Sequence, residues 1–217
     1  MSKSATASSR VNERKAETFL AAVAALQRGD VIAFPTETLY GLGADALNAA
    51  AVDKVFQLKD RDSANPIPVL VSDRAMLSIL VAEVPSLAQR LIERFWPGPL
   101  TLVLPARAEV PRPLLNSTGG VGVRISSHPI ATELVKSLGR PLTATSANPS
   151  GRAPAHTVEE AKIYFTGRIE IFVDGGALTS KTGSTVAEVI GDTIRVLREG
   201  EIRRAELEQV MEKGKVL

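Results

Sequence analysis

The sequence predicts an α/β domain built on a mixed β-sheet, and three observations lead to this fold class. Segments in which apolar side chains recur at helical spacing alternate with short apolar runs typical of buried strands. Near the C-terminus, two strand-like segments flank Gly191-Asp192, a dipeptide typical of tight hairpins, so at least one strand pair must be antiparallel. The chain has 217 residues, of which 44% are hydrophobic and 23% charged, which suits one globular domain.

We expect that domain to cover residues 13–217 and to follow a disordered tail over residues 1–12, which are mostly small and polar. The tail lacks the apolar middle segment of a secretory signal, and no apolar run approaches the roughly 18 residues of a membrane span. The absence of cysteine excludes disulfides and thiolate metal sites and fits a reducing compartment. A cytoplasmic protein with no membrane partner is therefore expected.

Three helices are expected in the first hundred residues, each marked by apolar side chains at helical spacing. Gly29 suits a left-handed cap after the first helix, while Asn48 and Ser86 suit the N-terminal caps of the second and third. Short β-rich apolar runs between them predict strands. In chain order, the expected elements are a helix over residues 13–27, a strand over 31–34, a helix after Asn48, a strand over 67–71 and a helix from Ser86 to the stop at Pro97-Gly98-Pro99.

The second half of the chain has clear helix boundaries as well. Pro129 stands at a first helical position with Gly139 after the last turn, and Thr157 and Glu160 have the spacing of a capping box. The expected helices cover residues 129–138, a segment after Thr157 and residues 206–213. The expected strands cover residues 101–104, 121–125, 141–145, 169–173, 184–190 and 193–197.

Three short motifs match known site patterns but have simpler explanations. Gly41-Leu-Gly43-Ala-Asp-Ala fits a dinucleotide-binding pattern, yet it begins seven residues past the strand end, where that pattern needs a tight turn. Lys181-Thr-Gly183 occurs in β-lactamases, but the companion motifs are absent. Arg90 and Arg94 share a helix face, which is more typical of a solvated surface than of a nucleic-acid site.

Polar segments instead gather at the ends of predicted strands, where open α/β sheets bind ligands. Lys59 and Arg61 lie two residues apart in one such segment. With amides and hydroxyls from other loops, they suit a polyphosphate better than acid–base chemistry, although a solvated loop pair is the alternative. Arg124 lies inside a predicted core strand and must find an anion or a hydrogen-bonded partner there. His128 and His156 lack the spacing of a zinc site, but nucleotidyl transfer needs mainly alignment and positive charge.

Five motifs occur in one order along the chain, and their combination is far more specific than any one of them. They are Phe34-Pro-Thr-Glu-Thr-Leu-Tyr-Gly-Leu-Gly43, Lys59-Asp-Arg61 with Asn65-Pro66, Phe95-Trp-Pro-Gly-Pro-Leu-Thr101, Val121-Gly-Val-Arg124 with His128-Pro129, and Thr145-Ser-Ala-Asn-Pro-Ser-Gly151. Together they resemble the YrdC/Sua5 family of threonylcarbamoyl-AMP synthases over residues 15–205. The resemblance implies a twisted open mixed sheet with flanking helices around a large concave cavity, in the single-domain bacterial form.

The resemblance also implies a reaction and a set of site residues. L-threonine, bicarbonate and ATP would give L-threonylcarbamoyladenylate and pyrophosphate, the first stage of the t6A modification of tRNA. By position, the residues expected to bind L-threonine are Thr36, Arg124, Thr143 and Ser184. Those expected to bind ATP are Lys59, Arg61, Asn65, Ser146, Asn148 and Arg198, with Lys59 and Arg61 as the catalytic residues. The polar turn after Phe34 is then one wall of the substrate pocket, whereas a glycine-rich connection whose hydroxyls cap the next helix is the simpler alternative.

Cofactor and partners follow from the same resemblance. Mg²⁺ is implied by the triphosphate and would be held mostly by phosphate oxygens and water, because no carboxylate cluster is visible in the sequence. No metal-ligating residues are therefore expected, and Glu37 is interpreted as loop structure first and as a metal or water contact second. The expected partners are the downstream t6A transferase proteins and a tRNA or double-stranded RNA.

Two other functions remain open at this stage. An RNA-binding module of the same fold would use a concave basic surface without adenylate chemistry, and with a net charge of only +2 that surface would need local clustering of Lys and Arg. Relatives of that kind tend to lack the Lys-x-Arg and Ser-x-Asn motifs, and both are present here. A nucleotide-binding regulator would bind ATP without any dependence on threonine.

Overall fold

The computed structural model describes residues 2–62 and 65–213, and it describes the side chains of residues 13–62 and 65–211. The α-helices are α1 (Ser2–Gln27), α2 (Ala49–Lys59), α3 (Arg74–Leu80), α4 (Ser86–Phe95), α5 (Pro129–Leu138), α6 (Val158–Phe165) and α7 (Arg204–Lys213), and a short 3₁₀-helix, η1, covers Arg112–Leu114. The strands are β1 (Ile32–Pro35), β2 (Tyr40–Gly43), β3 (Val69–Leu70), β4 (Leu100–Pro105), β5 (Gly120–Arg124), β6 (Leu142–Thr143), β7 (Thr145–Ser146), β8 (Ile171–Phe172), β9 (Thr185–Ile190) and β10 (Thr193–Arg198).

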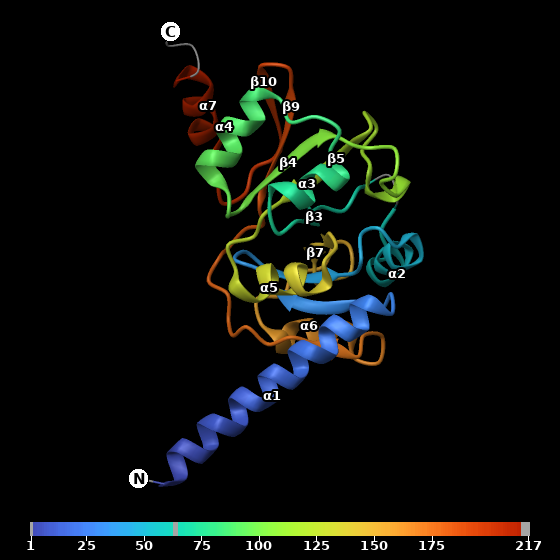
Figure 1. Ribbon diagram of the computed structural model, residues 1–217, viewed down its shortest axis with the longest axis vertical. Coiled ribbons are helices and arrows are strands. Elements are labelled where there is room, and N and C mark those ends of the chain that lie inside the picture. Colours follow the sequence, from blue (N-terminus) through green and yellow to red (C-terminus); the bar gives the residue numbers. More distant parts are fainter. Residues whose placement is uncertain (1, 63–64, 214–217) are drawn as a thin grey trace.

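The strands of these residues form two sheets. One has the order β10-β9-β4-β5-β3-β6 and the other the order β7-β2-β1-β8. In Figure 1 the first sheet lies in the upper part of the molecule with α3, α4 and α7, and the second lies below it with α1, α5 and α6. Both sheets are mixed, because β4–β9 and β1–β8 are parallel pairs while β9–β10 and β1–β2 are antiparallel. The α/β class with mixed strand pairing is confirmed, but the division of the strands into two sheets was not predicted from the sequence.

Most local signals act as their chemistry predicts. The side chain of Asn48 accepts a hydrogen bond from the Ala51 amide at 3.2 Å, and Thr157 forms the complete capping box with Glu160. Gly139 ends α5 in the left-handed region at φ 68°. Ser86 is the exception: it is the first residue of α4, preceded by Pro85, and makes no side-chain cap.

Several segments differ from the expectations, and α1, β2 and α3 are the first three. Helix α1 begins at Ser2 rather than near residue 13, since residues 2–27 contain no glycine or proline to interrupt it; Met1 lies outside the described residues. Strand β2 was not expected, because its sequence, Tyr-Gly-Leu-Gly, reads as a turn. It pairs along the whole of β1, with Ile32 opposite Gly43. Helix α3, which follows the side-chain cap of Asp73, was also missed.

The segment expected as one strand over residues 141–145 is divided between the two sheets. Thr143 pairs with Val69 of β3 in the six-stranded sheet, whereas Thr145 pairs with Leu42 of β2 in the four-stranded sheet. Ala144 is therefore the point at which the chain crosses from one sheet to the other. This crossing delivers the polar segment that begins at Ser146 to the junction of the sheets.

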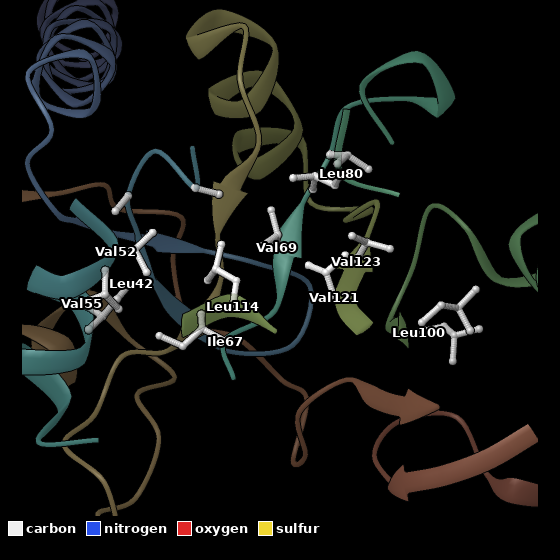
Figure 2. Close-up of a cluster of buried hydrophobic side chains, with 14 of the residues drawn as sticks. Leu42, Val52, Val55, Ile67, Val69, Leu80, Leu100, Leu114, Val121 and Val123 are labelled. Carbon is white, nitrogen blue, oxygen red and sulfur yellow. The ribbon is translucent and has the colours of Figure 1, made fainter. Parts of the chain in front are cut away.

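One apolar core joins the two sheets. Leu42 and Val55 from the β2 and α2 side belong to the same buried cluster as Val69, Val121 and Val123 of the six-stranded sheet (Figure 2). The side chains of Leu42, Val55, Val69, Val121 and Val123 are fully excluded from solvent. Because both sheets bury side chains in this cluster, their facing edges are held in a fixed relation.

Candidate active site

A cavity of about 540 Å³ lies between the two sheets. Its polar wall combines side chains from segments that are far apart in the sequence, namely Thr36, Thr38, Tyr40, Arg61, Asn65, Thr101, Asn116, Arg124, Thr145, Ser146, Asn148, Ser184, Arg198 and Glu199. Eight of the ten expected site residues are among them. The two that do not line the cavity are Lys59 and Thr143.

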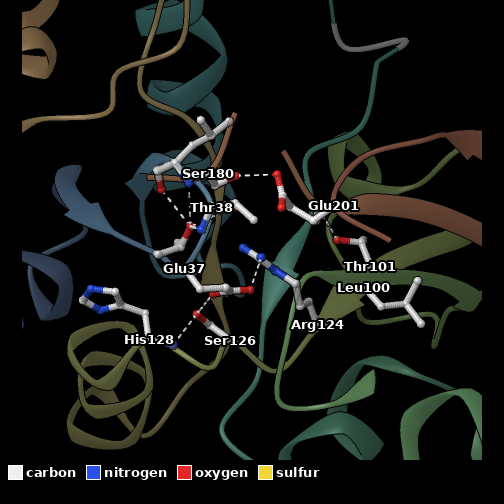
Figure 3. Close-up of polar contacts among 12 residues, drawn as sticks. Glu37, Thr38, Leu100, Thr101, Arg124, Ser126, His128, Ser180 and Glu201 are labelled. Atoms are coloured by element: carbon white, nitrogen blue, oxygen red, sulfur yellow. Dashed lines mark hydrogen bonds and ion pairs between the residues drawn. The ribbon is translucent and has the colours of Figure 1, made fainter. Parts of the chain in front are cut away.

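At one end of the cavity, Arg124 forms an ion pair with Glu37. Nη1 of Arg124 lies 2.5 Å from Oε1 of Glu37, and Oε2 of Glu37 accepts a hydrogen bond from the Ser126 hydroxyl (Figure 3). The side chains of Arg124 and Glu37 are only 5% and 15% exposed. Burial lowers the pKa of Arg124, and the carboxylate of Glu37 opposes that shift. Glu37 is therefore an ion-pair partner, a role that neither sequence expectation included.

Thr36 shapes the turn that carries Glu37. Its hydroxyl donates to the Leu39 carbonyl at 2.7 Å and accepts from the amides of Thr38 and Leu39 at 3.2 Å. This closed turn leads from β1 directly into β2 and places Glu37 opposite Arg124. Thr36 lines the cavity, but its hydroxyl is already engaged within the turn.

Ser184 lies at the same end and is held from two sides. Its hydroxyl is 2.9 Å from the hydroxyl of Thr101, and its carbonyl accepts a hydrogen bond from Nη2 of Arg198 at 2.8 Å. Thr101 was missed as a site residue, although it ends one of the five motifs; its position there is the signal that could have identified it. Arg198 ends β10 and brings a third arginine into the cavity.

Thr143 does not reach the cavity. It is fully buried, and its hydroxyl accepts from the Ala44 amide at 2.9 Å and donates to the Leu42 carbonyl at 3.2 Å. These bonds join the two sheets where the chain crosses between them. Ala144 and Thr145, the next residues, do line the cavity.

Near the other end of the cavity, Arg61 in its wall and Lys59 behind that wall donate to backbone carbonyls. Nε of Arg61 donates to the Asn65 carbonyl at 2.7 Å, which links the residues just after α2 to those before β3. Lys59, only 1% exposed, donates from Nζ to the carbonyls of Ser146 and Asn148 at 2.6 and 2.7 Å. Burial, with a smaller contribution from the charge of Arg61, lowers the pKa of Lys59 to about 7.

Asn148 completes this end. Its Nδ2 donates to the carbonyls of Pro149 and Arg152, and its Oδ1 is a buried acceptor with no hydrogen-bond partner among the described residues. Burial lowers the pKa of Arg198, and the charges of Arg124 and Arg61 lower it further. The cavity thus concentrates positive charge, and it suits an anion that extends past several cationic groups.

A protein-held metal is not indicated by the donor set. Among the residues that the structure describes, no group of three His, Cys, Asp or Glu side chains is placed to hold a metal ion. The residues present fit an ion that arrives on a polyphosphate and keeps phosphate and water oxygens as its ligands. No helix in the described part of the chain has the length and apolarity needed to cross a membrane.

Comparison with known proteins finds close matches. A family model for Sua5/YciO/YrdC domains, described as telomere recombination, matches residues 24–200. The threonylcarbamoyl-AMP synthase of Pyrococcus abyssi is 39% identical over 86% of this chain, and that of Bacillus subtilis is 40% identical over 88%. The crystal structure of P. abyssi Sua5 complexed with L-threonine superposes with a TM-score of 0.85 and 38% identity over 90% of this chain.

The chain spans little more than half the length of these relatives. It covers 55% of each of the two synthases and 57% of the P. abyssi chain in the threonine complex.

Proposed function

Because this chain belongs to the Sua5/YciO/YrdC family, we propose that it is an L-threonylcarbamoyladenylate synthase. The substrates are L-threonine, bicarbonate and ATP, and the products are L-threonylcarbamoyladenylate and pyrophosphate. One observation carries the proposal most directly. Arg61, Arg124, Ser146 and Ser184, from four separate segments, line a single cavity between the sheets.

The amino acid is assigned to the end that contains Arg124. The guanidinium N–H groups that do not donate to Glu37 suit the threonine carboxylate, because a planar fork of donors matches two carboxylate oxygens. The hydroxyl of Ser184, held by Thr101, is available at the same wall, and Thr36 contributes the turn beside it.

The ATP phosphates are assigned to the opposite end. Arg61 lines it with a charge held in place by the Asn65 carbonyl, and Ser146 and Asn148 contribute short polar side chains. Arg198, held by the Ser184 carbonyl, lines the same cavity within reach of the charges of both Arg124 and Arg61. Lys59 fixes the Ser146–Asn148 segment from behind and adds charge next to it. Asn65, which lines the cavity, accepts from Arg61 through its carbonyl and so holds the guanidinium in place.

The chemistry needs two steps. The amine of threonine and bicarbonate condense to a carbamate with loss of water, and a carbamate oxygen then attacks the α-phosphorus so that pyrophosphate leaves. The protein contributes alignment of the reactants and positive charge where the leaving group develops negative charge. Mg²⁺, when carried by the triphosphate, would supply further positive charge to the same oxygens.

Partners and location belong to the same proposal. The adenylate would be consumed by downstream t6A transferase proteins that modify tRNA, which is consistent with a cytoplasmic location. Direct binding of a tRNA or double-stranded RNA is a separate prediction, to be tested by titration with each RNA.

Pyrophosphate release tests the function. Release from ATP should require both L-threonine and bicarbonate, and omission of either should reduce it to the background rate. Release that is indifferent to threonine would exclude the synthase, and ATP binding without release would favour a regulator. Binding of RNA with neither activity would favour the RNA-binding alternative.

A further inference from the structure

Glu37 holds its carboxylate in a fixed position next to Arg124. One oxygen accepts from Nη1 of Arg124 at 2.5 Å, and the other accepts from the hydroxyl of Ser126. The Ser126 oxygen in turn accepts from the His128 amide at 3.2 Å, at the start of α5 (Figure 3). The carboxylate is thus anchored by β5 and by the segment that follows it, while Glu37 itself belongs to the β1–β2 turn.

The two charges of the pair nearly cancel each other, so the other charge near Ser184 is that of Arg198. Both side chains are largely excluded from water, so their charges are poorly screened and act strongly on any ligand nearby. A simple carboxylate that approaches Arg124 meets the attraction of the guanidinium together with the repulsion of Glu37. A ligand that also carries a positive group gains from both partners.

We propose that the Arg124–Glu37 pair makes this end of the cavity selective for a free amino acid over a simple carboxylate, with Glu37 as the specificity-determining residue. The proposal rests on the function proposed above, in which threonine binds here. A carboxylate bound to Arg124 places the α-ammonium group, only two bonds from the carboxylate carbon, in the field of Glu37. The dipole of the pair is therefore complementary to the dipole of the amino-acid zwitterion.

A binding comparison on the full chain tests this selectivity. Calorimetry would measure the dissociation constants of L-threonine and of (R)-3-hydroxybutanoate, which is threonine without its amine. The unsubstituted protein should prefer threonine by a large factor, and Glu37→Gln should reduce that preference about 10-fold to 100-fold. The amide oxygen of Gln can still accept a hydrogen bond from Arg124, so the change removes charge more than shape.

A matched control is available in the same sheet. Glu188 on β9 also forms an ion pair with an arginine, Arg195; the Glu188 side chain is only 6% exposed, whereas that of Arg195 is 55% exposed. Glu188→Gln should leave the ratio of the two dissociation constants unchanged, because this carboxylate does not contact Arg124. Affinity for ATP should stay within about twofold in Glu37→Gln.

The outcomes are distinct. Equal affinity of the unsubstituted protein for the two ligands would overturn the proposal without any variant. An unchanged preference in folded Glu37→Gln would overturn it as well, and loss of the preference confined to this variant would support it. Failure to bind threonine or to release pyrophosphate would instead refute the proposed function. If the protein releases pyrophosphate but binds L-threonine and (R)-3-hydroxybutanoate equally well, the selectivity proposal alone fails.

Discussion

Arg124 at one end of the cavity and the pair of Lys59 and Arg61 at the other are held in different ways. At the amino-acid end, Arg124 is held by the carboxylate of Glu37, which fixes the guanidinium and also cancels most of its charge. At the phosphate end, Lys59 and Arg61 donate to carbonyl oxygens of Ser146, Asn148 and Asn65. A carbonyl dipole orients a cation and leaves its full charge available.

This difference connects structure to the proposed ligands. A triphosphate carries several negative charges and benefits from uncancelled cations, whereas an amino-acid zwitterion has no net charge and fits a neutral pair. Burying a cation that has no anionic partner is unfavourable, and this shows at Lys59, where burial and the charge of Arg61 lower the pKa to about 7. The same contrast predicts which substitutions affect which substrate.

The largest effect is expected for Arg124→Met. Loss of the guanidinium should weaken L-threonine binding at least about 100-fold and leave ATP binding within about threefold, because the phosphate end keeps its own cations. Titration of the variant with threonine and with ATP measures the two changes in affinity separately. Similar losses for both ligands would contradict the division of the cavity into two ends.

Two further variants control this result. Arg124→Met leaves Glu37 buried without its partner, which costs about 3–5 kcal/mol of stability, so the double variant Arg124→Met/Glu37→Gln should recover much of that loss without recovering threonine binding. Arg195→Met also breaks an arginine–glutamate pair, that with Glu188, and should not affect threonine. Thermal unfolding measures the stability of each variant.

The second effect is at Lys59. Lys59→Met removes two charge-assisted hydrogen bonds to the segment that carries Ser146 and Asn148, and it should weaken ATP binding about 10-fold to 100-fold with little change for threonine. Lys54 is the matched control. It lies on the same helix and its Nζ also donates to a carbonyl, that of Gly29 at 2.8 Å, outside the cavity. If Lys59→Met and Lys54→Met reduced ATP affinity equally, Lys59 would have only a structural role.

Much of this arrangement follows from the sequence. The family resemblance, the α/β class and the caps of α2, α5 and α6 are confirmed, because each depends on local chemistry or on motifs in a fixed order. Local signals are sufficient to predict a hydrogen bond when its two partners are only a few residues apart in the sequence. Asn48 and Ala51, or Thr157 and Glu160, are such pairs.

Contacts between segments far apart in the sequence could not be predicted from local signals. The Arg124–Glu37 pair joins residues 87 positions apart, and Glu37 was interpreted as loop structure because no spacing rule links it to a strand on the other sheet. Strand β2 was missed for a related reason: Gly41 and Gly43 suggest a turn, yet they pair in a strand where the ring of Phe34 occupies the space of a side chain.

A smaller effect is expected from pH. The Lys59 ammonium has a pKa of about 7 in the free protein, and bound phosphate should raise it, so binding above pH 7 requires uptake of a proton. ATP affinity should therefore fall as the pH rises from 7.5 to 9, by about threefold to tenfold per unit, over a range in which the phosphates are already ionised. Lys59→Met should lose this dependence. Threonine affinity should fall less steeply, because in this range only the loss of the ligand's own α-ammonium proton at about pH 9 weakens its binding. An equal slope for both ligands from pH 7.5 upward would contradict the assignment of Lys59 to the phosphate end.

The smallest effect on binding is expected at Thr143, which the family resemblance assigns to L-threonine. Its hydroxyl is committed to the Ala44 amide and the Leu42 carbonyl, and it does not line the cavity. Thr143→Val keeps the shape and removes both bonds, so it should lower the free energy of unfolding by about 1–3 kcal/mol while threonine affinity stays within about twofold. Chemical denaturation and threonine titration measure the two quantities. A large loss of threonine affinity with unchanged stability would show that Thr143 does take part in threonine binding. The chain would then have to rearrange at the crossing between the sheets when threonine binds.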